Sequence, residues 1–240
     1  MRALVAQSRA ELRMTLRRGE SVLLAIGIPV LLLGFFSVVD VLPVGESDPV
    51  TFLFPGILAL AVMSTAMVST AIATGFERQY GVLKRLGTTP LGRPRLLAAK
   101  IVGILAVEVV QLVVLLVEAL LLGYRLKGPQ VALAALAMLI ATIAFAGLGM
   151  LMAGTLPALT TLAAANGLYL VLLLLSGMLI PLGQLPAGIA AVARALPSGA
   201  LADALHASLA GHHVPGRAWI VLVAWSVVSP AVAAARFRWE

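Results

Sequence analysis

Six long runs of apolar residues limit this chain to very few folds. They cover residues 21–39, 52–74, 101–122, 131–154, 162–181 and 218–235. Each is close to the roughly 20 residues that an α-helix needs to cross the ~30 Å hydrocarbon core of a bilayer. Because backbone groups must be satisfied within lipid, and the runs lack the alternating polarity of barrel strands, they predict helices. The sequence therefore predicts an all-α, polytopic membrane protein with six transmembrane helices.

Charge predicts the orientation of these helices. Of the 240 residues, 61% are hydrophobic and only 11% are charged, against about 25% charged residues in a soluble domain. Thirteen Lys and Arg residues lie in the N-terminal stretch, the connection after the second run and the C-terminal tail, and four lie elsewhere. Cytoplasmic loops carry such an excess, so both termini are expected in the cytoplasm. The net charge of +7 then reflects topology, and no nucleic acid partner is expected.

Two segments outside the six runs are expected to lie against the membrane. Residues 1–20 predict an amphipathic helix in the cytoplasmic interface, because its arginines fall within about 80° on a helical wheel. Those arginines are Arg2, Arg9, Arg13 and Arg17. Residues 181–217 form an apolar connection divided by prolines, and short helices are expected near residues 188–195 and 201–210. We expect this segment to lie on the outer surface or to re-enter the bilayer.

The sequence contains no catalytic motif that we can recognise. It has no cysteine, no G-x-x-x-x-G-K-[ST] phosphate loop, no H-E-x-x-H and no G-x-S-x-G. The neighbours His212 and His213 could bind a metal, but we favour a solvated pair because adjacent residues point apart on a helix. No cofactor and no metal are therefore expected in this chain. A membrane-embedded enzyme and a non-transporting membrane scaffold remain as alternatives to a transport protein.

The third run carries a stripe of polar residues. Glu108, Gln111 and Glu118 share an arc of about 80° on a helical wheel. A carboxylate costs at least ~2.5 kcal/mol at the centre of a membrane helix, so this arc is expected to face protein or water. Glu108 and Gln111 are candidates for the wall of a substrate path, or else for hydrogen bonds between helices. Asn166 in the fifth run has the same two interpretations.

The connection between the second and third runs is unusually basic. Residues 75–100 hold six of the 17 basic residues of the chain. Within them, residues 80–87 predict a short amphipathic helix, and Pro90 ends it. A short, firmly ended helix beside the membrane is typical of a docking site for another protein.

At this connection the sequence resembles the permeases of ABC-2 type transporters. Residues 77–91, ERQYGVLKRLGTTPL, are similar to the family pattern E-R-E-x-G-T-L-E-x-L-x-x-T-P-L. The stretch SGMLIPLGQLP at residues 176–186, followed by ALP at 195–197, also resembles the family. Gln79 and Lys84 depart from it, because acidic residues are usual at both positions. The resemblance covers nearly the whole chain.

The resemblance implies a transport subunit of the type V ABC exporter kind, similar to drug and antibiotic efflux permeases. It implies two copies of a separate ABC ATPase, which bind ATP and Mg, and a second permease chain that is identical or different. Residues 21–240 would form the transmembrane domain, with a coupling loop at 76–100 and a re-entrant outer loop at 181–217. The implied location is the cytoplasmic membrane of a bacterium.

The resemblance also assigns residues to roles. The residues implied in ATPase coupling are Glu77, Arg78, Gly81, Leu83, Lys84, Arg85, Thr89 and Pro90. The residues implied in an outer gate are Gly177, Pro181, Pro186 and Pro197. The implied substrate is a small hydrophobic or amphipathic compound, such as a drug, an antibiotic or a lipid-like molecule.

Overall fold

Every regular element that the structure describes is a helix. The computed structural model describes residues 19–39, 49–87, 92–125 and 130–237. The long single helices are α2 (Gly19–Val38), α6 (Gly92–Leu121), α7 (Val131–Thr155), α8 (Ala158–Leu174) and α11 (Gly216–Arg236). One further long helix consists of α3 (Pro49–Met63), the π-helix η1 (Ser64–Ser69) and α4 (Thr70–Gln79). The short elements are α5 (Val82–Gly87), the 3-10 helix η2 (Leu182–Gln184), α9 (Ala187–Ala195) and α10 (Pro197–Leu209).

Within the described residues, four helices are long and apolar enough to cross a membrane. They are Pro49–Gln79, Lys100–Leu121, Val131–Thr155 and Gly216–Arg236, and they correspond to the second, third, fourth and sixth apolar runs. The apolar parts of α2 and α8, Ala25–Val38 and Ala158–Leu174, are shorter. The count of six spans therefore stays a prediction. The expected interfacial helix at residues 1–20 lies almost wholly outside the described residues.

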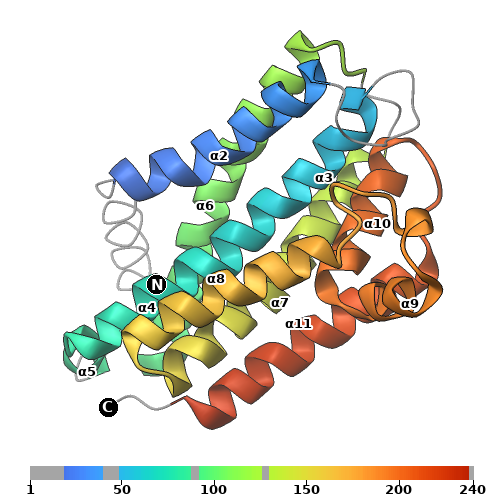
Figure 1. The fold of residues 1–240 in the computed structure, drawn as a ribbon. Helices are drawn as coiled ribbons and strands as arrows, with labels where there is room; N and C mark the ends of the chain where they lie inside the picture. The colour runs from blue at the N-terminus through green and yellow to red at the C-terminus, as the bar shows by residue number, and fades with distance from the viewer. Residues whose placement is uncertain (1–18, 40–48, 88–91, 126–129, 238–240) are drawn as a thin grey trace.

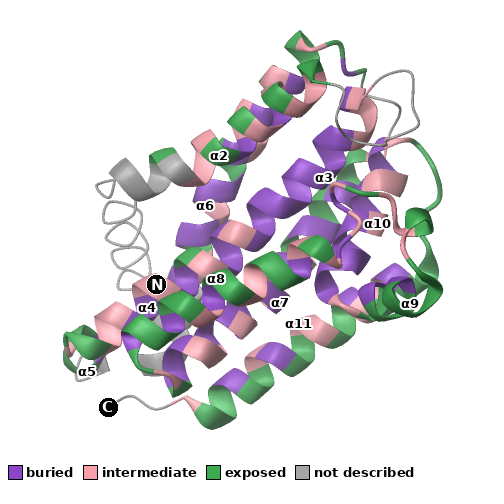
Figure 2. Ribbon diagram, in the orientation of Figure 1, coloured by how far each residue is buried: buried purple, intermediate pink, exposed green. Residues whose placement is uncertain are grey.

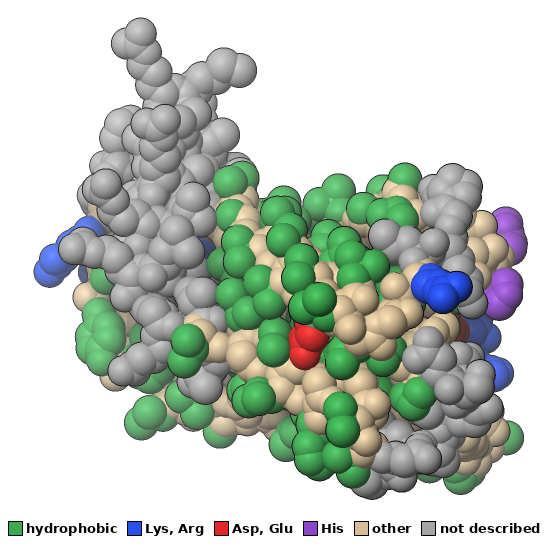
Figure 3. Space-filling view, turned by 90° about the horizontal axis from the view of Figure 1, so that it is seen from above, with side chains coloured by type: hydrophobic (Ala, Val, Ile, Leu, Met, Phe, Trp, Pro, Cys, Tyr) green, Lys and Arg blue, Asp and Glu red, His purple; other side chains and the backbone are tan. Residues whose placement is uncertain are grey.

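The surface of the molecule suits a bilayer. Leu121 is 84% exposed and Val38 is 79% exposed, as expected for side chains that face lipid. Figure 3 shows one face of the molecule, with hydrophobic side chains across its middle and basic side chains toward its two ends. A hydrophobic band with basic ends is typical of a membrane protein.

The helix α3–η1–α4 runs through the interior of the bundle. It packs against α2 and α6 on one side, and against α7, α8 and α10 on the other (Figure 1). Phe54 and Ile57 are 1% and 0% exposed, and 83% of the spanning window in this helix is buried within the chain. This helix is therefore enclosed by its neighbours, as Figure 2 shows by its buried residues.

Small residues let α7 pack closely against its neighbours. A Cβ on Gly147 would lie 2.5 Å from Ser229 Oγ, and a Cβ on Gly149 would lie 2.6 Å from the Met67 carbonyl oxygen. The Ser229 hydroxyl donates to the Ala144 carbonyl at 2.6 Å. Close contacts of this kind replace the hydrophobic effect as the source of association between membrane helices. They fix α7 against both α11 and the π-helix η1.

Candidate functional site

The candidate site at one end of the bundle is the elbow, defined as residues 75–85, in which α4 ends and α5 begins. Gly81 has a φ of 70°, a left-handed conformation that glycine adopts readily at the end of a helix. The Tyr80 N–H donates to the Phe76 carbonyl at 2.9 Å, and the Gly81 N–H donates to the Arg78 carbonyl at 3.0 Å. The elbow is thus a sharp, hydrogen-bonded change of direction.

The outward surface of the elbow is aromatic and basic. Tyr80 is 69% exposed and Val82 is 39% exposed, and Lys84 and Arg85 are also exposed. Leu83 is 1% exposed, so it anchors α5 to the bundle. Figure 1 shows α5 at the end of the molecule away from α9 and α10. Of the other residues assigned to coupling, Thr89 and Pro90 lie outside the described residues.

Glu77 does not belong to this outward surface. Its Oε2 lies 2.5 Å from Lys100 Nζ, and the two side chains are 14% and 7% exposed. The ion pair joins the last turn of α4 to α6. The sequence did not indicate Lys100 as a partner of Glu77. A lysine at the start of an apolar run is already explained by the excess of basic residues at the cytoplasmic ends of membrane spans.

Arg78 and Gly75 join the same turn to two further helices. Arg78 Nη2 donates to the Leu156 carbonyl at 2.6 Å, at the C-terminal end of α7, where helix carbonyls lack partners within the helix. Gly75 lies against α8, since a Cβ there would meet Thr161 Cγ2 at 3.4 Å. The elbow is therefore attached to α6, α7 and α8 as well as to its own helix.

A second cluster of polar groups lies in the interior of the bundle. Glu108 is 4% exposed and Gln111 is 1% exposed. Glu108 Oε2 lies 2.7 Å from the Thr142 hydroxyl, and Glu108 Oε1 is buried without a hydrogen-bond partner among the described residues. Gln111 Nε2 donates to the Ala25 carbonyl at 2.8 Å, and Gln111 Oε1 accepts from the Thr65 hydroxyl at 3.0 Å.

This cluster connects four helical segments. Glu108 and Gln111 lie on α6, and their partners lie on α7, α2 and the π-helix η1. Both side chains face protein, as the arc of polar residues predicts. In this arrangement they make hydrogen bonds between helices and are enclosed by the chain itself. Thr65 and Thr142 were not expected as partners, because threonine in an apolar run gives no signal of which helix it faces.

The other polar candidates lie nearer the surface. Asn166 is exposed on α8, and its Nδ2 donates to the Leu162 carbonyl of the same helix at 2.8 Å. Glu118 is half-buried, and its Oε2 is buried without a hydrogen-bond partner among the described residues. A Cβ on Gly34 of α2 would lie 3.2 Å from Glu118 Oε1. The structure therefore brings Glu108 and Gln111 together and leaves Asn166 apart from them.

Prolines stand at the starts of the short helices between α8 and α11. Pro181 precedes η2, Pro186 precedes α9, and Pro197 is the first residue of α10. Proline suits these positions because a helix start needs no N–H donor there. The two short helices expected from the sequence are confirmed as α9 and α10. Whether this segment re-enters a bilayer stays a prediction.

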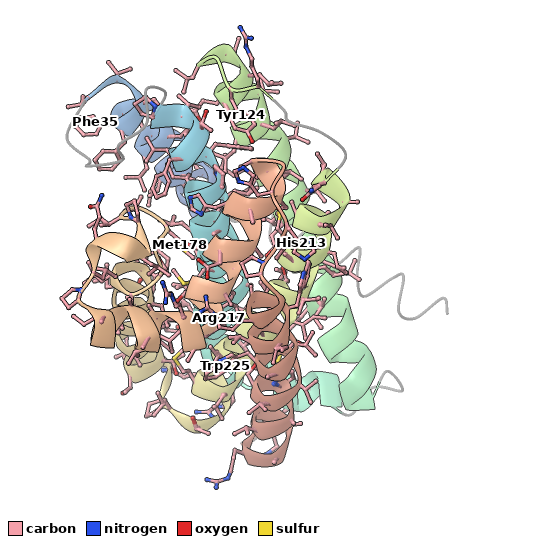
Figure 4. The ribbon with its side chains drawn as sticks, turned by 90° about the vertical axis from the view of Figure 1, so that its right-hand side faces the viewer. Phe35, Tyr124, Met178, His213, Arg217 and Trp225 are labelled. Carbon is pink, nitrogen blue, oxygen red and sulfur yellow. The ribbon has the colours of Figure 1, made fainter. Side chains whose placement is uncertain are left out.

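Gly177 makes the turn into this segment. It has a φ of 74°, and a Cβ there would lie 2.7 Å from Leu182 Cγ. The next residue, Met178, is 0% exposed and lies toward the middle of the molecule in Figure 4. The loop that follows α8 is therefore packed inward, with no room for a larger residue at position 177.

His206 on α10 is held between two carbonyl oxygens. Its Nδ1 lies 2.8 Å from the Ala202 carbonyl oxygen, and its Nε2 lies 3.0 Å from the Phe52 carbonyl oxygen of α3. The two rings also pack together, with centroids 4.6 Å apart. A neutral imidazole has one N–H and the imidazolium has two. Only the protonated ring therefore donates at both contacts.

We expect His206 to hold α10 against α3. His206→Phe keeps a ring beside Phe52 and removes the hydrogen bond between the two helices, and such a bond contributes about 1 kcal/mol. Hydrogen exchange of α10 amides should therefore show protection falling by about fivefold in this variant.

The double variant His212→Gln/His213→Gln is the matched control, because both histidines are exposed. This control should keep the protection of the parent. Equal protection of α10 in His206→Phe and in the parent would show that the side chain does not fix α10 to α3.

Comparison with known proteins assigns this helical membrane protein to a class. The fold and the site define a multi-pass membrane protein with an anchored elbow at one end and a packed helical segment at the other. The sequence model of the ABC-2 type transporter family matches residues 2–209, and the chain belongs to that family. It is therefore the permease component of an ABC transporter, that is, a transport subunit. No curated protein matches the chain significantly.

Proposed function

We propose that this permease is the membrane half of an exporter that is driven by a separate ABC ATPase seated on the elbow. Permeases of this family typically work with an ABC ATPase partner. The elbow carries the proposal, because it combines an exposed surface with firm attachment to the spanning helices. ATP and Mg would be bound by two ATPase copies, and a second permease chain, identical or different, would complete the path.

The chemistry of the elbow points to the kind of surface it would bind. Its sole acidic residue, Glu77, is turned inward and paired with Lys100. The exposed residues of the elbow include Tyr80, Val82, Lys84 and Arg85, which together present a ring, an aliphatic side chain and positive charge. Such a surface is complementary to a groove with acidic walls and an apolar floor. Gln79 and Lys84, where the family usually has acidic residues, agree with an acidic groove on the ATPase.

The proposed cargo is a small hydrophobic or amphipathic compound, such as a drug, an antibiotic or a lipid-like molecule. The spans are apolar, and their described polar groups are few. Glu108 and Gln111 would line the path only after α6 separates from α7. Asn166 would line it, or contact the second permease, from the exposed face of α8. A carboxamide exposed to lipid is costly, which supports cover by another chain at this face.

The positions of the outer gate and of the cytoplasmic side are proposed from the two ends of the bundle. The segment of Gly177, Pro181, Pro186 and Pro197 would act as the outer gate, because it lies at the end opposite the elbow (Figure 1). The excess of Lys and Arg at both termini and in the elbow supports a cytoplasmic elbow. The chain would then lie in the cytoplasmic membrane of a bacterium, with both termini inside the cell.

The docking surface can be tested by purification of the complex. The double variant Tyr80→Ala/Lys84→Glu removes the exposed ring and reverses a charge, without changing a buried group. We expect at least a tenfold loss of ATPase recovered with the tagged permease from mild detergent, measured by mass spectrometry and ATP hydrolysis. Aromatic residues near charged ones are typical energetic centres of an interface.

A matched control lies at the other end of α6. Leu121 is 84% exposed and Arg125 is exposed, so Leu121→Ala/Arg125→Glu changes size and charge similarly. This control should recover the ATPase as the parent does. Equal recovery with the elbow variant would move the docking site elsewhere. Failure of the parent itself to recover any ATPase would favour a membrane enzyme or a scaffold.

A further inference from the structure

The pairing of Glu77 with Lys100 gives the elbow a connection that its own helix does not provide. Both side chains are largely buried, and their charged atoms lie 2.5 Å apart. Breaking an ion pair in a largely buried site is costly, so such a pair resists separation. Glu77 is therefore committed to a contact within the chain and is not presented to a partner.

Adjacent residues of the elbow bind to different helices. Successive residues on a helix point about 100° apart, so Glu77 and Arg78 extend in different directions from the last turn of α4. Glu77 reaches Lys100 on α6, and Arg78 reaches the Leu156 carbonyl of α7. A displacement of this turn would therefore also displace α6 and α7.

Lys100 lies where the apolar part of α6 begins, and this part of the helix can carry the displacement. From Lys100 to Leu121, α6 is a continuous apolar helix of 22 residues, and this stretch contains no proline. At 1.5 Å per residue it extends over about 30 Å, which is the thickness of the bilayer core. A push at Lys100 therefore reaches the opposite end of α6.

We propose that the ion pair of Glu77 and Lys100 is a clasp that transmits movement of the elbow into α6. This inference rests on the proposed function, since it takes the elbow as the seat of an ATPase. Glu77 and Lys100 are positioning residues that act through α6. The exposed residues of the elbow would bind the ATPase. The ion pair would pass the movement of the bound ATPase from the elbow to α6.

The test follows α6 by the distance between two spin labels. The chain has no cysteine, so Leu121→Cys and Ile220→Cys can be labelled alone. These residues are 84% and 71% exposed, on α6 and on α11 respectively. The complex with its ATPase is reconstituted in nanodiscs, and the label distance is measured with and without ATP and Mg. The parent complex is expected to show an ATP-dependent change in this distance.

Glu77→Gln keeps the shape of the side chain and removes its charge. We expect this variant to retain the bound ATPase and its ATP hydrolysis while losing most of the distance change. The exchanged pair, Glu77→Lys with Lys100→Glu, should recover at least half of the change, because it restores opposite charges at the same two positions. Asp203→Asn is the matched control, since it breaks the partly exposed ion pair with Arg217 and should leave the change intact.

Each result has a distinct meaning. Loss of ATPase binding in Glu77→Gln would make Glu77 a docking residue and overturn the clasp. A full distance change in Glu77→Gln, no recovery in the exchanged pair, or no change in an ATPase-bound parent would overturn it as well. A parent that binds no ATPase would instead overturn the proposed function. Size-exclusion profiles of every variant show whether the fold is retained, and the exchanged pair keeps the test decisive if Glu77→Gln is unstable.

Discussion

Replacing Gly56 with alanine is expected to lower the thermal unfolding midpoint of the purified chain by about 10 °C. Gly56 lies on α3, and a Cβ there would overlap the Met178 carbonyl oxygen and lie 2.8 Å from its carbonyl carbon. Overpacking of an interior typically costs up to about 3 kcal/mol, and each kcal/mol shifts the midpoint by about 2–4 °C in a chain of this size. Thermal unfolding in detergent, followed by light scattering or intrinsic fluorescence, measures this shift.

The surroundings of Gly56 leave the loop little room to retreat. Met178 is 0% exposed, and its N–H donates to the Ser176 hydroxyl oxygen at 3.1 Å. Gly177 is confined on its other side by Leu182. The backbone after α8 is therefore held between α3 and η2, so the added methyl group must displace backbone and not only a flexible side chain.

Gly27→Ala provides the matched control on another helix. Gly27 lies within α2, and among the described residues no neighbouring helix has an atom within 4 Å of the position that a Cβ would take. Alanine is favoured over glycine in a helix interior by about 1 kcal/mol. The control should therefore unfold at the same temperature as the parent or higher. Similar losses in both variants would show that contact with Met178 is not the cause.

The helical framework follows directly from the apolar runs, for a simple physical reason. A chain segment in lipid must satisfy its own backbone groups, and the α-helix is the local way to do so. The runs at 131–154 and 218–235 accordingly match α7 (Val131–Thr155) and α11 (Gly216–Arg236). The turn at Gly81 and the prolines at the starts of α9 and α10 are equally local features, and the short helices beside them were predicted.

Partners across helices could not be predicted in this way. The periodicity of α6 shows that Glu108 and Gln111 share a face, but it does not show which helices pack against that face. Their partners Thr142 and Thr65 lie 34 and 46 residues away. The π-helix η1 likewise leaves no sequence signal, because its sequence, STAMVS, also suits an α-helix.

Glu77 illustrates the same limit at the candidate site. Its place in a family motif implied a role in coupling to an ATPase. The structure shows a largely buried ion pair between Glu77 and Lys100. The positive-inside rule explains a lysine at this position without any partner, so the sequence held no reason to pair the two. Only the fold shows that Lys100 of α6 lies beside the last turn of α4.

Replacing Lys100 with methionine is expected to destabilise the chain by about 3 kcal/mol. The change keeps the apolar stem of the side chain and leaves the largely buried carboxylate of Glu77 without this partner, which is the costly way to break such a pair. The thermal midpoint should fall by about 10 °C. Glu77→Leu/Lys100→Met replaces both charges by apolar groups, and such replacements are often neutral or stabilising. The double variant should therefore unfold within a few degrees of the parent.

The same double variant separates stability from transmission. If the clasp depends on charge, Glu77→Leu/Lys100→Met keeps the fold and the bound ATPase but loses the ATP-dependent change between labels on α6 and α11. Apolar side chains in contact can slide past each other, because dispersion attraction is weak for each pair of atoms and has no preferred direction. A pair of opposite charges held together in a buried site cannot slide at so little cost. If the double variant is stable and still shows the ATP-dependent distance change, the ion pair serves only the stability of the fold. If the double variant is stable and shows no distance change, the ion pair takes part in the movement of the spans.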